Sequence, residues 1–198
     1  ITPLGETELE YGSEQVYTIT PDEGYEIEDV IVDGLSVGVI EEYTFTNITE
    51  AHTISVVFVI KTYLMSSSSG INGQIAPVGD TIVEHGTSLL YTFVPDEGYE
   101  VEDVIVDGIS VGAVDEYSFI DISEPHTISV SFILKTYVIT SIAGENGTIT
   151  PLGETEVDHG SDLEFTITPD IGYEIDDVIV NGTSVGAPAI YTFSNISS

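Results

Sequence analysis

Carboxylates are the most abundant groups in this chain that could do chemistry. The sequence holds 35 Asp and Glu against two Lys and Arg, a formal net charge of -33. Such oxygen ligands suit Ca²⁺, and Asp22-Glu23, Asp96-Glu97 and Asp170 lie on predicted turns. Because no Asp-x-Asp-x-Asp-Gly loop accompanies them, we predict that they solvate the surface and protect sheet edges. No metal ligand is predicted, and a calcium clamp between modules is an alternative that a higher melting temperature in Ca²⁺ would support.

The four histidines are isolated from one another in the sequence. His85 and His159 stand where the first copy of the repeat described below has Tyr11, a replacement that a metal site would not tolerate. We interpret them as aromatic residues that flank a turn, and His52 and His126 as polar residues at the start of a strand. Lone histidines without clustered ligands do not predict a zinc site.

Lys61 and Lys135 are the only basic residues, and they occupy equivalent places in the repeat. One interpretation is a Lys-Asn isopeptide crosslink, which would lower the intact mass by one ammonia per bond. The favoured interpretation is an ion pair with one of the many acids.

Four Asn-x-Ser/Thr triplets could accept a glycan. They begin at Asn47, Asn146, Asn181 and Asn195. Asn181 is replaced by Asp33 and Asp107 in the other copies, an exchange that turn preference explains without sugar. Ser, His and Asp occur only as residues repeated on small modules, which rarely enclose a large pocket. We therefore predict no catalytic residue, no cofactor and no enzymatic activity.

One repeated stretch must position all of these groups. Residues 21–34 return at 95–108 and at 169–182, each time 74 residues on. A fixed period of this kind predicts a tandem array. We expect a module at 1–60 that lacks its first strand, a complete one at 61–134, and one at 135–198 that lacks its last strand. Since both ends fall inside a repeat, we expect the chain to belong to a longer array.

Period-two alternation predicts an all-β fold of small β-sandwich or β-grasp-like modules without a long helix. Tyr25 and Ile27 share one parity, whereas Val30 and Val32 share the other, so we expect a β-bulge at Glu28-Asp29. Asp-Gly or Asn-Gly after this strand predicts a tight hairpin.

The segments that join the modules contain no Gly, Pro or Ser linker. Residues 58–65 run without a break from one apolar strand into the next, and residues 132–140 repeat the pattern. We expect rigid or semi-rigid joints at Lys61 and Lys135.

Composition narrows the partners and the compartment. Apolar residues make up 41% of the chain, and the mean hydropathy is +0.22, enough to favour folding over disorder. A surface this acidic repels nucleic acid and anionic lipid. The longest apolar run, Val56–Ile60, is far short of the roughly 20 residues of a membrane helix. Without cysteine there is no disulfide framework, and we expect an extracellular, cell-surface location.

The repeat also resembles a known family. Its motifs are Asn146-Gly147 with Pro151-x-Gly153, Gly172-Tyr173, Val178-x-Val180-Asn-Gly182, and Tyr191-Thr-Phe193. They resemble the divergent internalin-B-type repeats of bacterial and archaeal surface proteins, in three tandem copies. The resemblance implies small β-rich modules along adhesins, stalks and cell-wall-anchored proteins, and it brings no catalytic residues.

We therefore expect an extracellular structural repeat protein. It would serve as a spacer, a stalk or a subunit of a filament assembled head to tail through β-strands, with contacts to neighbouring copies. The alternative is an adhesin module that binds a glycan or protein through loops such as 38–42 and 112–116. These loops differ among the copies, which does not favour one repeated ligand.

Overall fold

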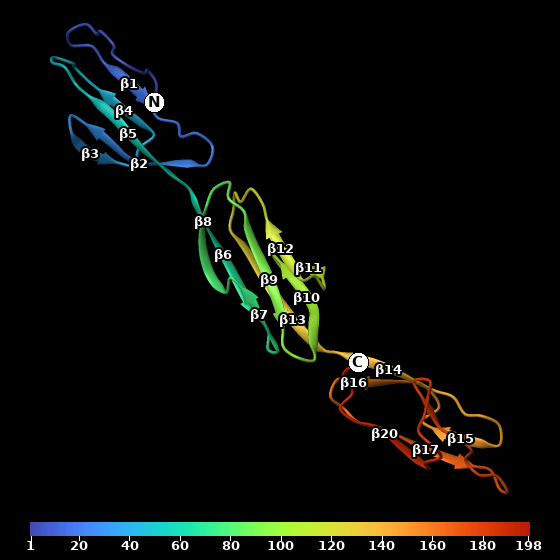
Figure 1. Cartoon of the computed structure of the whole chain (residues 1–198). Coiled ribbons are helices and arrows are strands. Elements are labelled where there is room, and N and C mark those ends of the chain that lie inside the picture. The colour runs from blue at the N-terminus through green and yellow to red at the C-terminus, as the bar shows by residue number, and fades with distance from the viewer. The chain divides into compact units, whose positions relative to one another are not determined.

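The computed structural model describes all 198 residues and contains strands and turns but no helix (Figure 1). The prediction of an all-β fold is confirmed. No helix of the chain could cross a membrane. The chain separates into two compact units, 1–67 with 77–91 and 116–128, and 68–76 with 92–115 and 129–198. Division at residues 60/61 and 134/135 stays a prediction, and we use module 1, module 2 and module 3 as names for the residue ranges it defines.

Module 1 forms two small sheets over one core. Its strands are β1 (Gln15–Thr18), β2 (Tyr25–Val32), β3 (Leu35–Gly38), β4 (Glu42–Phe45) and β5 (Ile54–Ile60). β1 pairs with β4, and the other sheet has the order β3-β2-β5. Ile27, Val30 and Val32 of β2 pack in one cluster with Ile19 and Phe45. Residues from both sheets thus share the core, as in a β-sandwich.

Module 2 contains eight strands. They are β6 (Thr62–Ser69), β7 (Gly73–Ala76), β8 (Gly79–Glu84), β9 (Leu89–Pro95), β10 (Tyr99–Val106), β11 (Ile109–Gly112), β12 (Glu116–Phe119) and β13 (His126–Leu134). They form a five-stranded sheet in the order β11-β10-β13-β6-β8 and a three-stranded sheet in the order β12-β9-β7.

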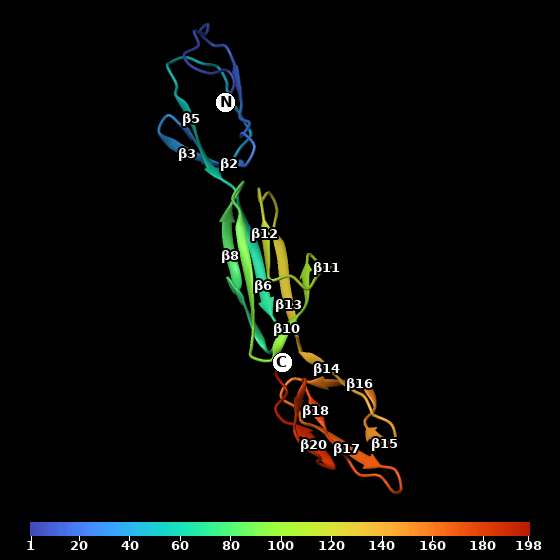
Figure 2. The ribbon, with the colours of Figure 1, turned by 45° about the vertical axis from the view of Figure 1, so that its right-hand side comes forward.

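Module 3 contains three small sheets (Figure 2). Its strands are β14 (Thr136–Ser141), β15 (Gly147–Thr150), β16 (Gly153–Asp158), β17 (Leu163–Pro169), β18 (Ile179–Val180), β19 (Thr183–Ser184) and β20 (Ile190–Phe193). β14 pairs with β16, β18 pairs with β19, and the third sheet has the order β15-β17-β20.

The predicted bulge and hairpin are both confirmed. The pairing of β2 with β5 shifts register between Ile27 and Asp29, so Glu28 is the extra residue. Asp33 and Gly34 have φ angles of 49° and 80°, as a type I′ turn requires. The shared parity with Ile27 predicted an inward position for Tyr25. This prediction is wrong, because Tyr25 is 45% exposed.

The burial of an equivalent phenylalanine differs between the final strands of modules 1 and 2. Phe132 of β13 is 8% exposed, whereas Phe58 of β5 is 38% exposed. The Phe132 ring lies against Gly73, where an added Cβ would be 2.4 Å from the ring. Phe58 of module 1 is thus less enclosed than its counterpart Phe132 in module 2.

Candidate functional site: the joints at Lys61 and Lys135

At the first joint a single residue separates two strands. β5 ends at Ile60 and β6 begins at Thr62. The Lys61 N–H donates to the carbonyl oxygen of Gly24 in module 1 at 2.8 Å, and the Lys61 carbonyl accepts from the His85 N–H in module 2 at 2.9 Å. Both backbone groups of the connecting residue are therefore hydrogen bonded, one to each module.

A histidine ring fills the space beside this connection. A Cβ added to Gly24 would lie 2.2 Å from Cδ2 of His85, so the ring packs directly on the glycine. The Tyr63 hydroxyl lies 3.3 Å from Nδ1 of the same ring. Gly24 also has a φ of +78°, which other residues rarely adopt. The turn at Gly24 thus needs glycine for two reasons, its backbone conformation and the neighbouring ring.

The second joint has the same construction. The Lys135 N–H donates to the Gly98 carbonyl at 2.9 Å, and the Lys135 carbonyl accepts from the His159 N–H at 2.8 Å. A Cβ added to Gly98 would lie 2.4 Å from Cδ2 of His159. The Tyr137 hydroxyl lies 3.3 Å from Nδ1 of that ring. Each joint lies inside one of the two compact units.

The equivalent positions in module 3 and module 1 are open. Gly172, equivalent to Gly24 and Gly98, has no atom within 4 Å of an added Cβ. Tyr11, equivalent to His85, is 85% exposed. The prediction that His85 and His159 flank a turn is confirmed, because the next residues, Gly86 and Gly160, have left-handed φ angles. Their position at the joint was not predicted.

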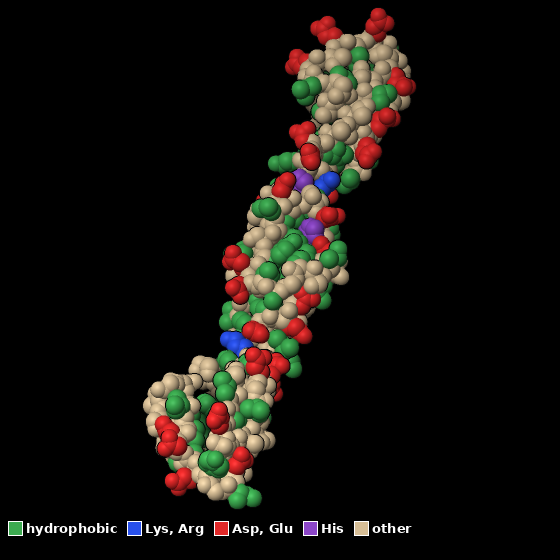
Figure 3. All heavy atoms as spheres, turned by 90° about the vertical axis from the view of Figure 1, so that its right-hand side faces the viewer, with side chains coloured by type: hydrophobic (Ala, Val, Ile, Leu, Met, Phe, Trp, Pro, Cys, Tyr) green, Lys and Arg blue, Asp and Glu red, His purple; other side chains and the backbone are tan.

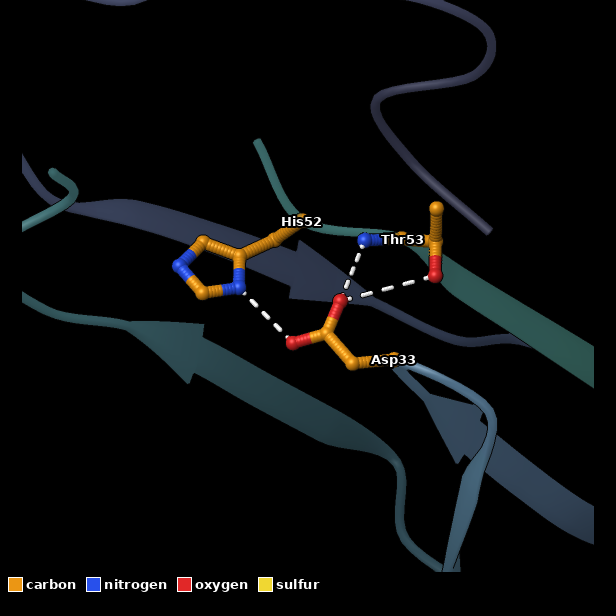
Figure 4. Close-up of polar contacts among 3 residues, drawn as sticks. All are labelled: Asp33, His52 and Thr53. Carbon is orange, nitrogen blue, oxygen red and sulfur yellow. Dashed lines mark hydrogen bonds and ion pairs between the residues drawn. The ribbon is translucent and has the colours of Figure 1, made fainter. Parts of the chain in front are cut away.

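A second polar cluster fixes the hairpin of module 1 to the start of β5 (Figure 4). One carboxylate oxygen of Asp33 accepts from the Thr53 N–H at 2.7 Å, and the other lies 2.7 Å from Nδ1 of His52. These two bonds, the backbone one first, hold the pKa of Asp33 below its ordinary value. The His52 ring stacks on Phe45 at 4.9 Å. The prediction named His52 as a polar end residue but missed its partner.

The cluster recurs in part in module 2. The His126 ring stacks on Phe119 at 4.6 Å, and Asp107 stands at the position of Asp33. Module 3 has Asn181 at this position. The arrangement therefore accompanies the strand that leads into each joint.

The remaining predicted sites lie apart from one another. An ion pair joins His52 and Asp33, whereas the pair expected for Lys61 or Lys135 is not formed. The glycan candidates are exposed and have left-handed φ angles at Asn47, Asn146, Asn181 and Asn195, which agrees with the turn interpretation. Glycosylation and the isopeptide bond stay predictions.

Acidic side chains are spread over the surface. On the face drawn in Figure 3 they are scattered and form no single patch. No three His, Asp or Glu side chains are grouped so as to hold a metal ion. The calcium clamp stays a prediction.

Comparison with known protein families matches one segment of the chain. Residues 137–195 match the family model of the divergent InlB B-repeat domain. No curated protein matches the chain. The matched segment covers most of module 3 and contains Tyr137 and His159 of the second joint. The match supports the family resemblance for one copy, and this segment is thus similar to a repeat of bacterial surface proteins.

Proposed function

We propose that the chain is a structural segment of a bacterial surface protein, with three tandem copies of the repeat that act as a stiff spacer or stalk. The observation that carries the proposal is the joint, where the one residue between two strands is hydrogen bonded to both modules. Loops that move independently have few such contacts. A joint without free backbone groups favours fixed spacing over flexible tethering.

Stiffness across the first joint can be tested by distance measurement. The chain has no cysteine, so the double variant E41C/I82C takes two spin labels and no others. Both positions are exposed and lie in the first compact unit. We expect one narrow distance distribution. The matched control inserts Gly-Ser-Gly-Ser after Lys61 and should broaden it. Equal widths in the two proteins would contradict a stiff joint.

We further propose that such segments assemble into filaments by strand exchange at their sheet edges. Support comes from strand edges that have no neighbouring strand. β5 is an edge strand of the β3-β2-β5 sheet, and β14 pairs only with β16. Open edges of this kind favour pairing with another chain. Electron micrographs of the native assembly should show fibres, and dispersed monomers would count against this part of the proposal.

The adhesin alternative is tested separately. The loop at 38–42 presents Val39, which is 67% exposed, but the equivalent loops differ in sequence. Binding of the intact chain on a glycan array would favour the adhesin, and an array without binding would leave the spacer as the better explanation.

A further inference from the structure

The chain enters module 2 through β6 and leaves it through β13. β6 begins directly after the joint at Lys61, and β13 ends directly before the joint at Lys135. The two strands are neighbours in the sheet with the order β11-β10-β13-β6-β8 (Figure 2). Tension along the chain would therefore enter and leave the module through two strands that are hydrogen bonded to each other.

Both strands begin at the same end of the module. The Lys61 carbonyl, just before β6, accepts from the His85 N–H, and the Gly86 N–H donates to the Ile122 carbonyl at 2.8 Å. Ile122 lies in the segment between β12 and β13. Two consecutive residues, His85 and Gly86, thus connect the start of β6 with the segment that leads into β13.

Both strands also finish at the same end. Asn72 follows β6, and its carbonyl accepts from the Asp96 N–H at 2.9 Å. The Gly98 carbonyl, in the same turn, accepts at 2.9 Å from the N–H of Lys135, directly after β13. Neighbouring strands that begin together and finish together are parallel.

The backbone of β6 is bonded on both sides. The Gly70 N–H, just after β6, donates to the Val130 carbonyl of β13 at 2.8 Å. On the other side, Lys61 bonds with the residue that follows β8. Backbone groups alternate between the two sides of a strand, so every second residue of β6 faces β13, at Leu64, Ser66 and Ser68.

The parallel pair lies in the middle of its sheet and over the core. β10 and β8 flank it on either side. Met65 of β6 is fully buried, and Ile128 and Val130 of β13 are 2% and 3% exposed. A hydrogen bond in such surroundings is stronger than one in contact with water. The bonds between β6 and β13 are therefore among the best protected of the module.

We propose that β6 and β13 form a mechanical clamp, through which module 2 carries tension between its two joints. When the chain is pulled at the joints, β6 is drawn toward its start and β13 toward its end. Because the strands are parallel neighbours, they slide past each other only if their ladder bonds break together. This goes beyond a stiff spacer, because a rod can keep its length at rest and still unravel when it is pulled.

Force spectroscopy on the intact chain can compare two pulling directions. The chain has no cysteine, so introduced pairs at exposed positions fix the pulling points. K61C/I133C pulls β6 by its start and β13 near its end, in shear. K61C/E124C pulls both strands from the same end, so the bonds break one at a time. We expect shear to need at least about twice the force. An equal or lower force in shear would overturn the proposal.

A matched pair of proline variants tests which bonds resist the force. Ser68→Pro removes an N–H that faces β13. Ile82→Pro is the control, because Ile82 is 71% exposed on the edge strand β8. Its partner is Leu64, so its N–H points away from β6. Pulled in shear, Ser68→Pro should need less force, and Ile82→Pro the same force as the parent.

Equal forces for the two proline variants would overturn the proposal. The comparison of pulling directions needs no proline, so it decides the matter even where Ser68→Pro fails to fold. A flexible joint would contradict the stiff spacer but leave the pairing of β6 with β13 intact. Failure of the clamp and failure of the proposed function are therefore distinguishable.

Discussion

The packing of His159 on Gly98 makes a quantitative prediction for the substitution Gly98→Ala. Alanine at a left-handed φ costs about 1–2 kcal/mol. Its Cβ would also lie 2.4 Å from the His159 ring, which must move and lose its contact with Tyr137. Overpacking of this kind costs a further 1–3 kcal/mol, as a rough range. Gly172→Ala is the matched control, because Gly172 has φ +90° and no neighbour within 4 Å.

The assay is hydrogen exchange at the amides of Lys135 and His159, whose hydrogen bonds form the joint. Gly98→Ala should speed their exchange by roughly 30- to 3,000-fold, since each 1.4 kcal/mol is a factor of ten. Gly172→Ala should leave these two amides unchanged. On a His159→Ala background, Gly98→Ala should cost about 1–3 kcal/mol less, because only the backbone strain remains. Equal costs of Gly98→Ala with and without the ring would refute the packing argument.

Three further predictions concern the modules themselves. The lowered pKa of Asp33 means that its ionised carboxylate stabilises module 1 above pH 3.8, the ordinary value for this carboxyl. This stabilisation is lost as the pH falls through the lowered pKa. In denaturation curves measured at a series of pH values, Asp33→Asn should remove this loss of stability in acid. Phe132→Ala should destabilise by about 3–5 kcal/mol in urea unfolding, and Phe58→Ala by well under half of that, because Phe58 is 38% exposed against 8% for Phe132. The buried hydroxyl of Tyr91 has no hydrogen-bond partner, and Phe165 stands at the equivalent position, so Tyr91→Phe should leave the melting temperature unchanged or raise it; a clear fall would contradict this assignment.

Local features of the fold could be predicted from the sequence because their causes are local. The parity change after Ile27 predicts the bulge, and Asp33-Gly34 predicts the hairpin, since both follow from neighbouring residues. Residues 173–178 share this pattern but form no strand. A strand needs hydrogen bonds from a partner strand, and no strand pairs with residues 173–178.

The joint could be predicted only in part. The unbroken apolar run predicted that one strand leads into the next, and Lys61 is the one residue between them. The contact of His85 with Gly24 was missed, because it joins residues far apart in the sequence. A signal was nevertheless present in the sequence. The glycine at the position of Gly24 recurs in all three copies, and a residue with a ring side chain precedes Gly12, Gly86 and Gly160.

The stiffness of the joints is the central claim, and ¹⁵N relaxation at the amides of Lys61 and Lys135 tests it most directly. Both N–H groups are hydrogen bonded to the preceding module. The account predicts order parameters of about 0.85 at both residues, equal to those of the adjoining strands. Values below about 0.6 at these two residues, with rigid strands on either side, would contradict it.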